Sequence, residues 1–290
     1  MEKKRLIIID SNSIIHRAYH ALPPLSTKKG ELVNAVYGFL LVFFKVLREF
    51  QPDFVVATFD FPAPTFRHKE FKEYKATRPK APDELYNQIP KVKKILESFN
   101  VPIFEKEGFE ADDLIGTISR LAPQKQILPE IETIILSGDL DTLQLINPQT
   151  KVYILKKGVK ETIFYDEKAV QERYGLSPEQ LVDFRALKGD PSDNIPGVPS
   201  IGEKTAIKLI KEFGSLENLY SNLDNLKQPL RTKLEEYKEQ AFFSRSLAKI
   251  NQNVEIDFDL KEGEWKNYNR ERVIKILQEL EFFSLITRLP

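Results

Sequence analysis

The feature that most constrains the fold is a set of short, uninterrupted apolar runs rich in β-branched residues. The runs Leu6–Ile9 and Phe54–Phe59 each end directly in an aspartate, and Thr133–Leu136 reaches one through a serine and a glycine. Two further runs lie at Val101–Phe104 and Val152–Leu155. Strands that are apolar without alternation are typical of a parallel sheet covered by helices on both faces.

Helical patterns separate these runs. Ala35–Phe50 is apolar nearly all round and predicts a buried helix, whereas Glu84–Phe99 and Ala111–Leu121 are amphipathic. Strand and helix therefore alternate through the first 165 residues or so, which predicts an α/β domain with a mostly parallel central sheet. We expect this domain to span residues 1–170.

Beyond Asp166 the strand-like runs nearly vanish, so residues 171–290 are expected to form a small all-α domain. A helix closed by Gly175 is expected first, followed by a helix that begins with a serine cap and a proline. The helical patterns of this half are Asp166–Gly175, Ser177–Leu187, Glu203–Phe213, Pro229–Ile250 and Asn269–Leu280.

The chain contains no cysteine, which excludes disulfides and thiolate metal sites. Its N-terminus lacks the length and cleavage site of a signal peptide, and its longest apolar run, Phe39–Phe44, is too short to span a bilayer. We therefore expect a soluble cytoplasmic protein.

Carboxylates follow the predicted strands. Asp10, Asp60 and Asp139 come at or just after strand ends, where open α/β sheets bind ligands. Taken singly, each could be a helix cap or a first-turn acid. Six more acids occur in comparable contexts: Glu110, Asp112, Asp113, Asp141, Asp190 and Asp193.

Bringing these acids together without compensation would be costly, because two like charges 4 Å apart repel by about 4 kcal/mol at an effective dielectric near 20. Divalent cations would remove that cost. Oxygen ligands without cysteine or histidine favour Mg²⁺ or Mn²⁺, and a pair of such ions can hydrolyse a phosphodiester. If these acids are assigned to metal, the other charged residues are net basic, so the formal net charge of zero does not exclude a basic surface.

The segment after Asp60 interleaves cations with aromatic residues, and Arg67, Tyr74, Lys75 and Arg78 are among them. Such a run is most often a solvated loop. Cations with flat rings also suit single-stranded nucleic acid, whose phosphates and bases they contact, and the adjacent carboxylates favour this reading. The segment His16–Leu25 has a similar but weaker mixture.

The stretch GVPSIGEKT (197–205) nearly matches a nucleotide-binding P-loop, but no strand precedes it and Glu203 displaces Lys204 from the motif position. The surrounding pattern predicts a helix–hairpin–helix at about 181–213. Backbone N–H groups of Gly202, Lys204 and Thr205 could hold a phosphate at the start of the second helix. A purely structural corner is the alternative.

Six segments in this order resemble the 5′-nuclease (flap endonuclease) superfamily, most closely the 5′→3′ exonuclease domains of bacterial DNA polymerase I enzymes. The segments are LIIIDSN, VVATFD, FRHKEFKEYKATRP, GFEADD, SGDLD and KGDPSDNIPGVPSIGEKTA. The resemblance implies a PIN-like nuclease core with a helical arch at about 62–85, followed by the helix–hairpin–helix domain.

The resemblance also implies roles for individual residues. The nine acids would hold two divalent metals, Lys75 and Arg78 would face the scissile phosphate from the arch, and the hairpin would bind duplex DNA and a K⁺ ion. The expected DNA contacts are Arg17, Tyr19, Arg67, Tyr74, Gly197, Gly202, Lys204 and Thr205.

The implied activity is hydrolysis at DNA 5′ ends, nicks and 5′ flaps, with RNA-primed ends as further candidates, giving 5′-phosphate and 3′-hydroxyl products. The resemblance further implies a role in primer removal, Okazaki fragment processing and repair. It implies a nucleoid-associated monomer that works with a DNA polymerase in cis or in trans. Whether the chain stands alone or was cut from a polymerase is open, although Met1 is typical of a true start.

Two positions depart from the family pattern, because Ser11 and Ser200 stand where glycine is common. If Ser200 requires a positive φ, serine there would cost about 1–2 kcal/mol. Two alternatives remain for function. One is a non-catalytic DNA-structure-binding protein, and the other is a haloacid-dehalogenase-type phosphatase using the DLDT segment at Asp139.

Overall fold

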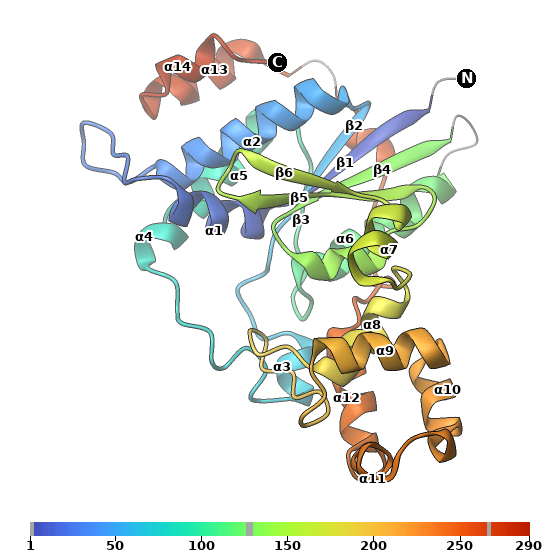
Figure 1. The fold of residues 1–290 in the computed structure, drawn as a ribbon. Helices are drawn as coiled ribbons and strands as arrows, with labels where there is room; N and C mark the ends of the chain where they lie inside the picture. Colours follow the sequence, from blue (N-terminus) through green and yellow to red (C-terminus); the bar gives the residue numbers. More distant parts are fainter. Residues whose placement is uncertain (1–2, 126–129, 266–267) are drawn as a thin grey trace.

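The computed structural model describes residues 3–125, 130–265 and 268–290 (Figure 1). Its centre is a six-stranded sheet in the order β3-β2-β1-β4-β5-β6, parallel except for β6, which is antiparallel to β5. The strands are β1 (Lys4–Asp10), β2 (Phe54–Thr58), β3 (Ile103–Phe104), β4 (Ile131–Ser137), β5 (Thr150–Lys157) and β6 (Glu161–Tyr165). The predicted mostly parallel sheet is confirmed.

Strand β6 was not predicted from the sequence. It is an edge strand whose residues are mostly half-buried or exposed, so it lacks the continuous apolar pattern of the other strands. It pairs with β5 through a tight turn in which Gly158 adopts a φ of +61°. Glycine populates such a φ without steric penalty.

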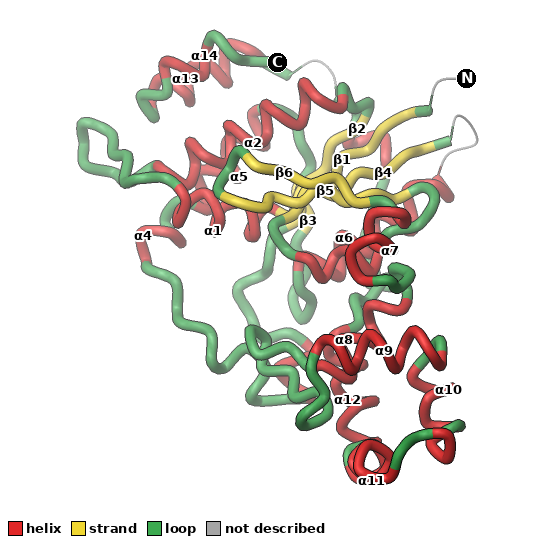
Figure 2. Tube along the Cα trace, in the orientation of Figure 1, coloured by secondary structure: helices red, strands yellow, loops and turns green. Residues whose placement is uncertain are grey.

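Helices cover both faces of the sheet, as Figures 1 and 2 show. In β1, Ile7 and Ile9 pack into the core under α2, whereas Leu6 and Ile8 pack into the opposite core with α6. The helices of this part are α1 (Ser11–Ala21), α2 (Asn34–Phe50), α3 (Phe66–Glu70), α4 (Asp83–Tyr86), α5 (Ile89–Ser98), α6 (Ala111–Leu121) and the 3₁₀ turns η1 (Ala122–Lys125) and η2 (Leu140–Leu145). This two-sided burial explains the continuous apolar runs.

The helix predicted over residues 84–99 is two helices, α4 and α5. The break lies at Gln88, whose buried side-chain oxygen accepts hydrogen bonds from the N–H groups of Ala35 and Val36 at the start of α2. Pro90 in the first turn of α5 is compatible with a new start but not with helix interior. The long helix predicted over 229–250 is likewise interrupted, at Tyr237.

A helical layer follows the sheet and lies below it in Figure 1. Its elements are α7 (Glu167–Tyr174), α8 (Gln180–Lys188), α9 (Glu203–Phe213), α10 (Leu216–Ser221), η3 (Leu223–Asn225), α11 (Gln228–Glu236) and α12 (Lys238–Ala248). The 3₁₀ turn η4 (Leu260–Gly263) packs against β2 instead. Helices α8 and α9 pack against each other, as a helix–hairpin–helix requires. The proposed boundary near residue 170 stays a prediction.

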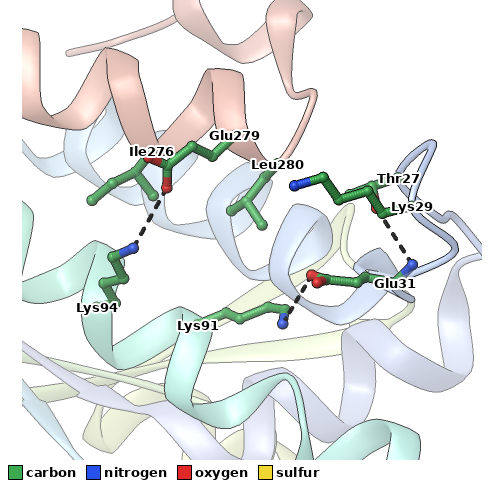
Figure 3. Close-up of a pocket in the computed structure, with 8 residues that line it drawn as sticks. All are labelled: Thr27, Lys29, Glu31, Lys91, Lys94, Ile276, Glu279 and Leu280. Atoms are coloured by element: carbon green, nitrogen blue, oxygen red, sulfur yellow. Dashed lines mark hydrogen bonds and ion pairs between the residues drawn. The ribbon is translucent and has the colours of Figure 1, made fainter.

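The end of the chain returns to the α/β part. Helices α13 (Arg270–Glu279) and α14 (Phe283–Ile286) contribute Val273, Leu277 and Leu285 to the core formed by α2 and α5. Figure 3 shows the edge of this junction, where α13, α5 and the 27–31 loop line a cavity of about 260 Å³. Two ion pairs border it, Lys94–Glu279 (3.5 Å) and Lys91–Glu31 (3.2 Å).

Among the described residues, no helix has the length and apolar character needed to cross a membrane.

Candidate active site

Three aspartates meet at the carboxyl ends of adjacent strands. Asp10 ends β1, and β1 lies between β2 and β4, the strands that lead to Asp60 and Asp139. All three line one cavity of about 280 Å³, together with Glu110 and Asp112. The strand order thus brings together acids that lie up to 129 positions apart in the chain.

Asp10 is the most buried of the three strand-end aspartates. Its Oδ2 accepts a hydrogen bond from Ser137 Oγ (2.6 Å) and its Oδ1 accepts one from Ser13 N (3.3 Å), which makes it the N-cap of α1. Burial raises the pKa of Asp10 to about 6, and the nearby carboxylates of Asp60 and Asp139 add to that rise. A cation in the cavity would therefore stabilise the charged form.

The start of α6 supplies two more acids to the cavity, Glu110 and Asp112. Asp60 Oδ1 accepts a hydrogen bond from Ala111 N (2.8 Å), which ties β2 to this helix start. Asp112 Oδ1 is buried and has no hydrogen-bond partner. Burial raises the pKa of Asp112 well above its usual range, although Arg67 opposes that rise. An unpartnered buried carboxylate oxygen is what a metal ligand looks like without its ion.

Asp113 differs from its neighbours, because all of its acceptor capacity is used inside the protein. Arg67 donates to both oxygens (2.8 Å each), and the N–H groups of Glu110 and Asn251 donate at 3.1 and 2.8 Å. Asp113 is fully buried. We predicted it as a metal ligand, but this arrangement makes it a structural partner of Arg67.

Two predicted DNA contacts, Arg67 and Tyr74, are buried. The Arg67 side chain is 2% exposed and also donates to the carbonyls of Leu247 and Lys249, so it joins α3, α6 and the end of α12. Tyr74 donates its hydroxyl toward Glu110 and Asp193 (3.1 and 3.2 Å). Because neither side chain is accessible, the structure assigns both a structural role instead.

Lys75 and Arg78 reach the carboxylates from the predicted arch. Lys75 Nζ lies 2.6 Å from Glu110 Oε1 and 3.9 Å from Asp193 Oδ2, and Arg78 forms an ion pair with Asp193. Both cations line the same cavity as Asp10 and Asp60. Burial would raise the pKa of Glu110, but Lys75 and Arg67 outweigh it and lower that pKa.

Only part of the predicted helical arch is helical. Helix α3 covers Phe66–Glu70, turns occupy residues 72–77, and the chain then runs without regular structure to α4. Lys75 adopts a φ of +56°, and its N–H donates to the carbonyl of Asp193 (2.9 Å). A left-handed residue interrupts a helix. Pro79 and Pro82 have no backbone N–H to donate, so they also disfavour a helix here.

The acids after β4 and in the hairpin share a cation that the sequence analysis did not single out. Arg185 on α8 forms ion pairs with both Asp141 and Asp190. Burial raises the pKa of Asp141 to about 8, and Asp139 adds to the rise while Arg185 opposes it. The one available signal was the position of Arg185 one helical turn before the GDPSD segment.

His16 and Asn12 also line the cavity and were missed, because they belong to α1, whose helical pattern was not recognised. Burial lowers the pKa of His16. Of the predicted DNA contacts on this helix, Arg17 donates to the carbonyls of Gly138 (3.0 Å) and Lys156 (3.2 Å). Tyr19 is half-buried and packs against the α2 core.

The hairpin between α8 and α9 depends on left-handed residues. Gly189 and Gly197 have φ values of +73° and +62°, and a Cβ on Gly197 would lie 2.3 Å from Gly189 N. Ser200 has a φ of +67°, so the condition set for it in the sequence analysis is met. Gly197 N donates to buried Ser244 Oγ (3.0 Å) and is therefore not available to a phosphate.

The other hairpin positions remain compatible with DNA contact. Gly202 and Lys204 are exposed, and Thr205 is half-buried in the first turn of α9. Backbone N–H groups in that turn have no intrahelical acceptor, which favours an anion there.

The acids that line the cavity are suitable ligands for a divalent ion, but their side chains do not converge on one point. Asp10, Asp60, Asp112 and Asp139 line one cavity, and Asp112 Oδ1 is unpartnered. However, no group of three or more acidic or histidine side chains in the described part of the chain has converged on a metal-ligating geometry. A bound dication would remove the repulsion between these carboxylates and so allow them to approach one another.

Comparison with protein families gives two adjacent matches. Residues 5–175 match the family described as "5′-3′ exonuclease, N-terminal resolvase-like domain", and residues 176–271 match "5′-3′ exonuclease, C-terminal SAM fold". The two matches together cover most of the chain.

Among curated proteins, DNA polymerase I of Bacillus subtilis is 44% identical over 289 residues, covering 99% of this chain and 32% of the relative. DNA polymerase I of Caldicellulosiruptor bescii is 44% identical over 287 residues, covering 98% and 33%. The chain thus spans about a third of the length of these relatives.

Among solved structures, the T5 5′-exonuclease with bound zinc superposes with a TM-score of 0.72 at 18% identity, covering 97% of this chain and 100% of that one. The catalytic core of Rad2 in complex with DNA substrate gives a TM-score of 0.62 at 20% identity, covering 99% and 93%. Similarity at this level of identity establishes the shared fold.

Proposed function

The chain belongs to the 5′-3′ exonuclease family and is a 5′ nuclease, and from that premise we propose that it cleaves DNA at 5′ ends, nicks and 5′ flaps with the help of two divalent ions. The observation that carries the proposal is the shared cavity of Asp10, Asp60, Asp112 and Asp139, which Lys75 and Arg78 border. Acids to bind metal and cations to bind phosphate lie in one place.

We propose Mg²⁺ or Mn²⁺ as the ions, since the available ligands are all carboxylates. Asp10, Asp60, Asp112 and Asp139 would hold the first ion. Glu110, Asp141, Asp190 and Asp193 would contribute to the second, directly or through water. When bound, such ions lower the pKa of a water molecule and neutralise charge on the phosphate oxygens.

The reaction forms one bond and breaks one. The water oxygen bonds to phosphorus, the P–O3′ bond breaks, and the departing O3′ takes up a proton. The products are a 5′-phosphate and a 3′-hydroxyl. Lys75 and Arg78 face the reacting phosphate and stabilise the negative charge that builds up on its oxygens.

DNA is held by two features in this proposal. The hairpin at residues 189–202 and the first turn of α9 contact duplex phosphates without reading sequence. Backbone carbonyls of the hairpin would hold a K⁺ ion. The Arg17 side chain, beside Gly138, and Tyr19 lie on the helix that follows Asp10 and would contact the 5′ strand.

The relatives are DNA polymerase I enzymes, which suggests a division of labour. We propose that the chain removes 5′ ends, RNA-primed ones included, ahead of a DNA polymerase in the same chain or a separate one, as a monomer at the chromosomal DNA.

The test is a 5′-labelled flap duplex incubated with the protein and Mg²⁺, with EDTA as the control and the products mapped at nucleotide resolution. The proposal expects metal-dependent cleavage near the flap junction and a 5′-phosphate on the downstream product. Tight binding without a cut product would instead favour the non-catalytic DNA-binding alternative. The phosphatase alternative has no structural support, because Asp139 follows β4 and not the first strand.

A further inference from the structure

The nine carboxylates fall into two sets according to their partners. Among the described residues, four of them form no ion pair, and these are Asp10, Asp60, Asp112 and Asp139. The same four line the 280 Å³ cavity. The other five are each paired with a lysine or arginine of this chain: Glu110, Asp113, Asp141, Asp190 and Asp193.

Arg185 makes the most direct of these pairings. Two different nitrogens of its guanidinium reach two carboxylates, NH2 pairing with Asp141 and NH1 with Asp190. The three side chains are 20%, 17% and 13% exposed, so water screens them only in part. Asp141 comes from η2 and Asp190 from the hairpin, so one arginine joins the sheet to the helical layer.

The location of Arg185 distinguishes it from the other cations. Lys75 and Arg78 lie on a segment of turns and irregular chain. Arg185 lies in the middle of α8, where Phe184, Ala186 and Leu187 are buried and the helix packs against α9 and α12. Its backbone is therefore fixed, and its guanidinium stays within reach of Asp141 and Asp190.

The cavities separate Asp141 from the four unpaired aspartates, whereas the paired Glu110 lines the same cavity as those four. Asp141 and Arg185 line a separate cavity of about 210 Å³, with Tyr174 and Lys188, and neither lines the cavity of the four unpaired aspartates. A divalent ion approaching Asp141 and Asp190 would meet a positive charge already placed between them.

We propose that Arg185 is a positioning cation that occupies the place between Asp141 and Asp190 in the DNA-free protein, so that one divalent ion binds tightly among the unpaired aspartates and a second binds weakly. The inference rests on the proposed two-metal function and specifies how its two sites differ. The second ion then binds firmly only when substrate phosphate adds negative charge to the site.

The physical reason is electrostatic competition. A fixed positive charge beside two ligands repels an incoming dication. Arg185 also donates a hydrogen bond to Asp190 Oδ2, whereas Asp141 Oδ1 contacts it as an ion pair without a hydrogen bond. Removing that charge should tighten binding of the second ion by at least about tenfold, even after discounting for solvent screening.

The experiment titrates the full chain without DNA with Mn²⁺ and measures free Mn²⁺ by electron paramagnetic resonance. Arg185→Gln removes the charge, Arg185→Lys keeps a charge, and Lys188→Gln removes a cation from the same helix whose partner is Glu203, outside the acidic cluster. Arg185→Met retains the apolar stem and replaces the Gln variant if that variant does not fold.

The expected result is one tight Mn²⁺ in the wild-type chain and in Lys188→Gln, with a second, much weaker one. Arg185→Gln should bind the second Mn²⁺ at least about tenfold more tightly, and Arg185→Lys should lie close to wild type. An unchanged or weakened second site in folded Arg185→Gln overturns the inference.

Failure of the proposed function would look different. If the wild-type chain bound no Mn²⁺ at all, or if Asp112→Asn left the tight site intact, the metal-dependent mechanism itself would be wrong. Those results concern the unpaired aspartates and do not depend on Arg185.

Discussion

Lys75 Nζ lies 2.6 Å from Glu110 Oε1, so a cation from the irregular segment after β2 sits directly on an acid at the start of α6. The Lys75 side chain is 22% exposed and that of Glu110 is 10% exposed. The pairing places a positive charge beside the four unpaired aspartates of the cavity. In the proposed mechanism, a substrate phosphate would compete with Glu110 for the same ammonium group.

Lys75→Ala should slow cleavage of a 5′-flapped duplex by about 10²- to 10³-fold, because one positioned charge facing the reacting phosphate is lost. Thermal stabilisation by Mg²⁺ should persist, since the unpaired aspartates are intact. Single-turnover cleavage and thermal melts with and without Mg²⁺ measure the two effects. Lys72→Ala, an exposed lysine in the same segment, is the control. Loss of the Mg²⁺ effect in Lys75→Ala would show that its role has been misplaced.

Asp60→Ala should abolish detectable cleavage and largely preserve DNA binding, because it removes a ligand from the cavity but none of the DNA-facing cations. Flap cleavage and a binding titration in Ca²⁺ test the two statements. Since Asp60 also accepts a hydrogen bond from Ala111 N, circular dichroism must show an intact fold. Asp257→Ala, at an exposed position away from the cavity, is the matched control. Near-normal cleavage by Asp60→Ala would contradict a metal role there.

Arg67→Met should destabilise the protein by about 3–5 kcal/mol, because it leaves the fully buried Asp113 carboxylate without its partner. The double variant Arg67→Met with Asp113→Leu should recover most of that loss, since an apolar pair can replace a buried ion pair. Urea unfolding followed by circular dichroism measures both. If Arg67 acted on DNA instead, the single variant would keep its stability and lose DNA affinity.

Ser200→Gly should stabilise the protein by about 1 kcal/mol, because Ser200 adopts a φ of +67° that glycine tolerates without a Cβ penalty. The Lys233 hydrogen bond that it removes is exposed and contributes little. Thermal or urea unfolding gives the value. Ser246→Gly, in the last turn of α12, should have the opposite sign through its helix propensity. A destabilised Ser200→Gly would show that the hairpin needs the serine hydroxyl.

Much of the fold could be predicted because its signals are local. The apolar runs that became β1, β2, β4 and β5 are buried on both faces, so each carries its own signature regardless of the rest of the chain. Strand β6 was missed because an edge strand is only half covered. The 84–99 helix was predicted as one element because the reach of Gln88 to α2 cannot be read from periodicity.

The place of the candidate site could be predicted from the sequence, but the roles of neighbouring acids within it could not. Asp10, Asp60 and Asp139 follow strands, and parallel strands end at one edge of a sheet, so their meeting follows from topology alone. The neighbouring acids Asp112 and Asp113 looked alike in sequence. They differ in the structure because one faces the cavity and the other faces Arg67.

By itself, therefore, the sequence determined the α/β architecture and the edge of the sheet at which acids meet. These follow from burial patterns and backbone sterics, which act within a few residues. Only the tertiary structure decided which cation meets which acid: Arg67 with Asp113, Lys75 with Glu110, and Arg185 with Asp141 and Asp190. Electrostatic pairing depends on distances between segments 5 to 46 positions apart, and those distances exist only once the cores on both faces of the sheet have packed.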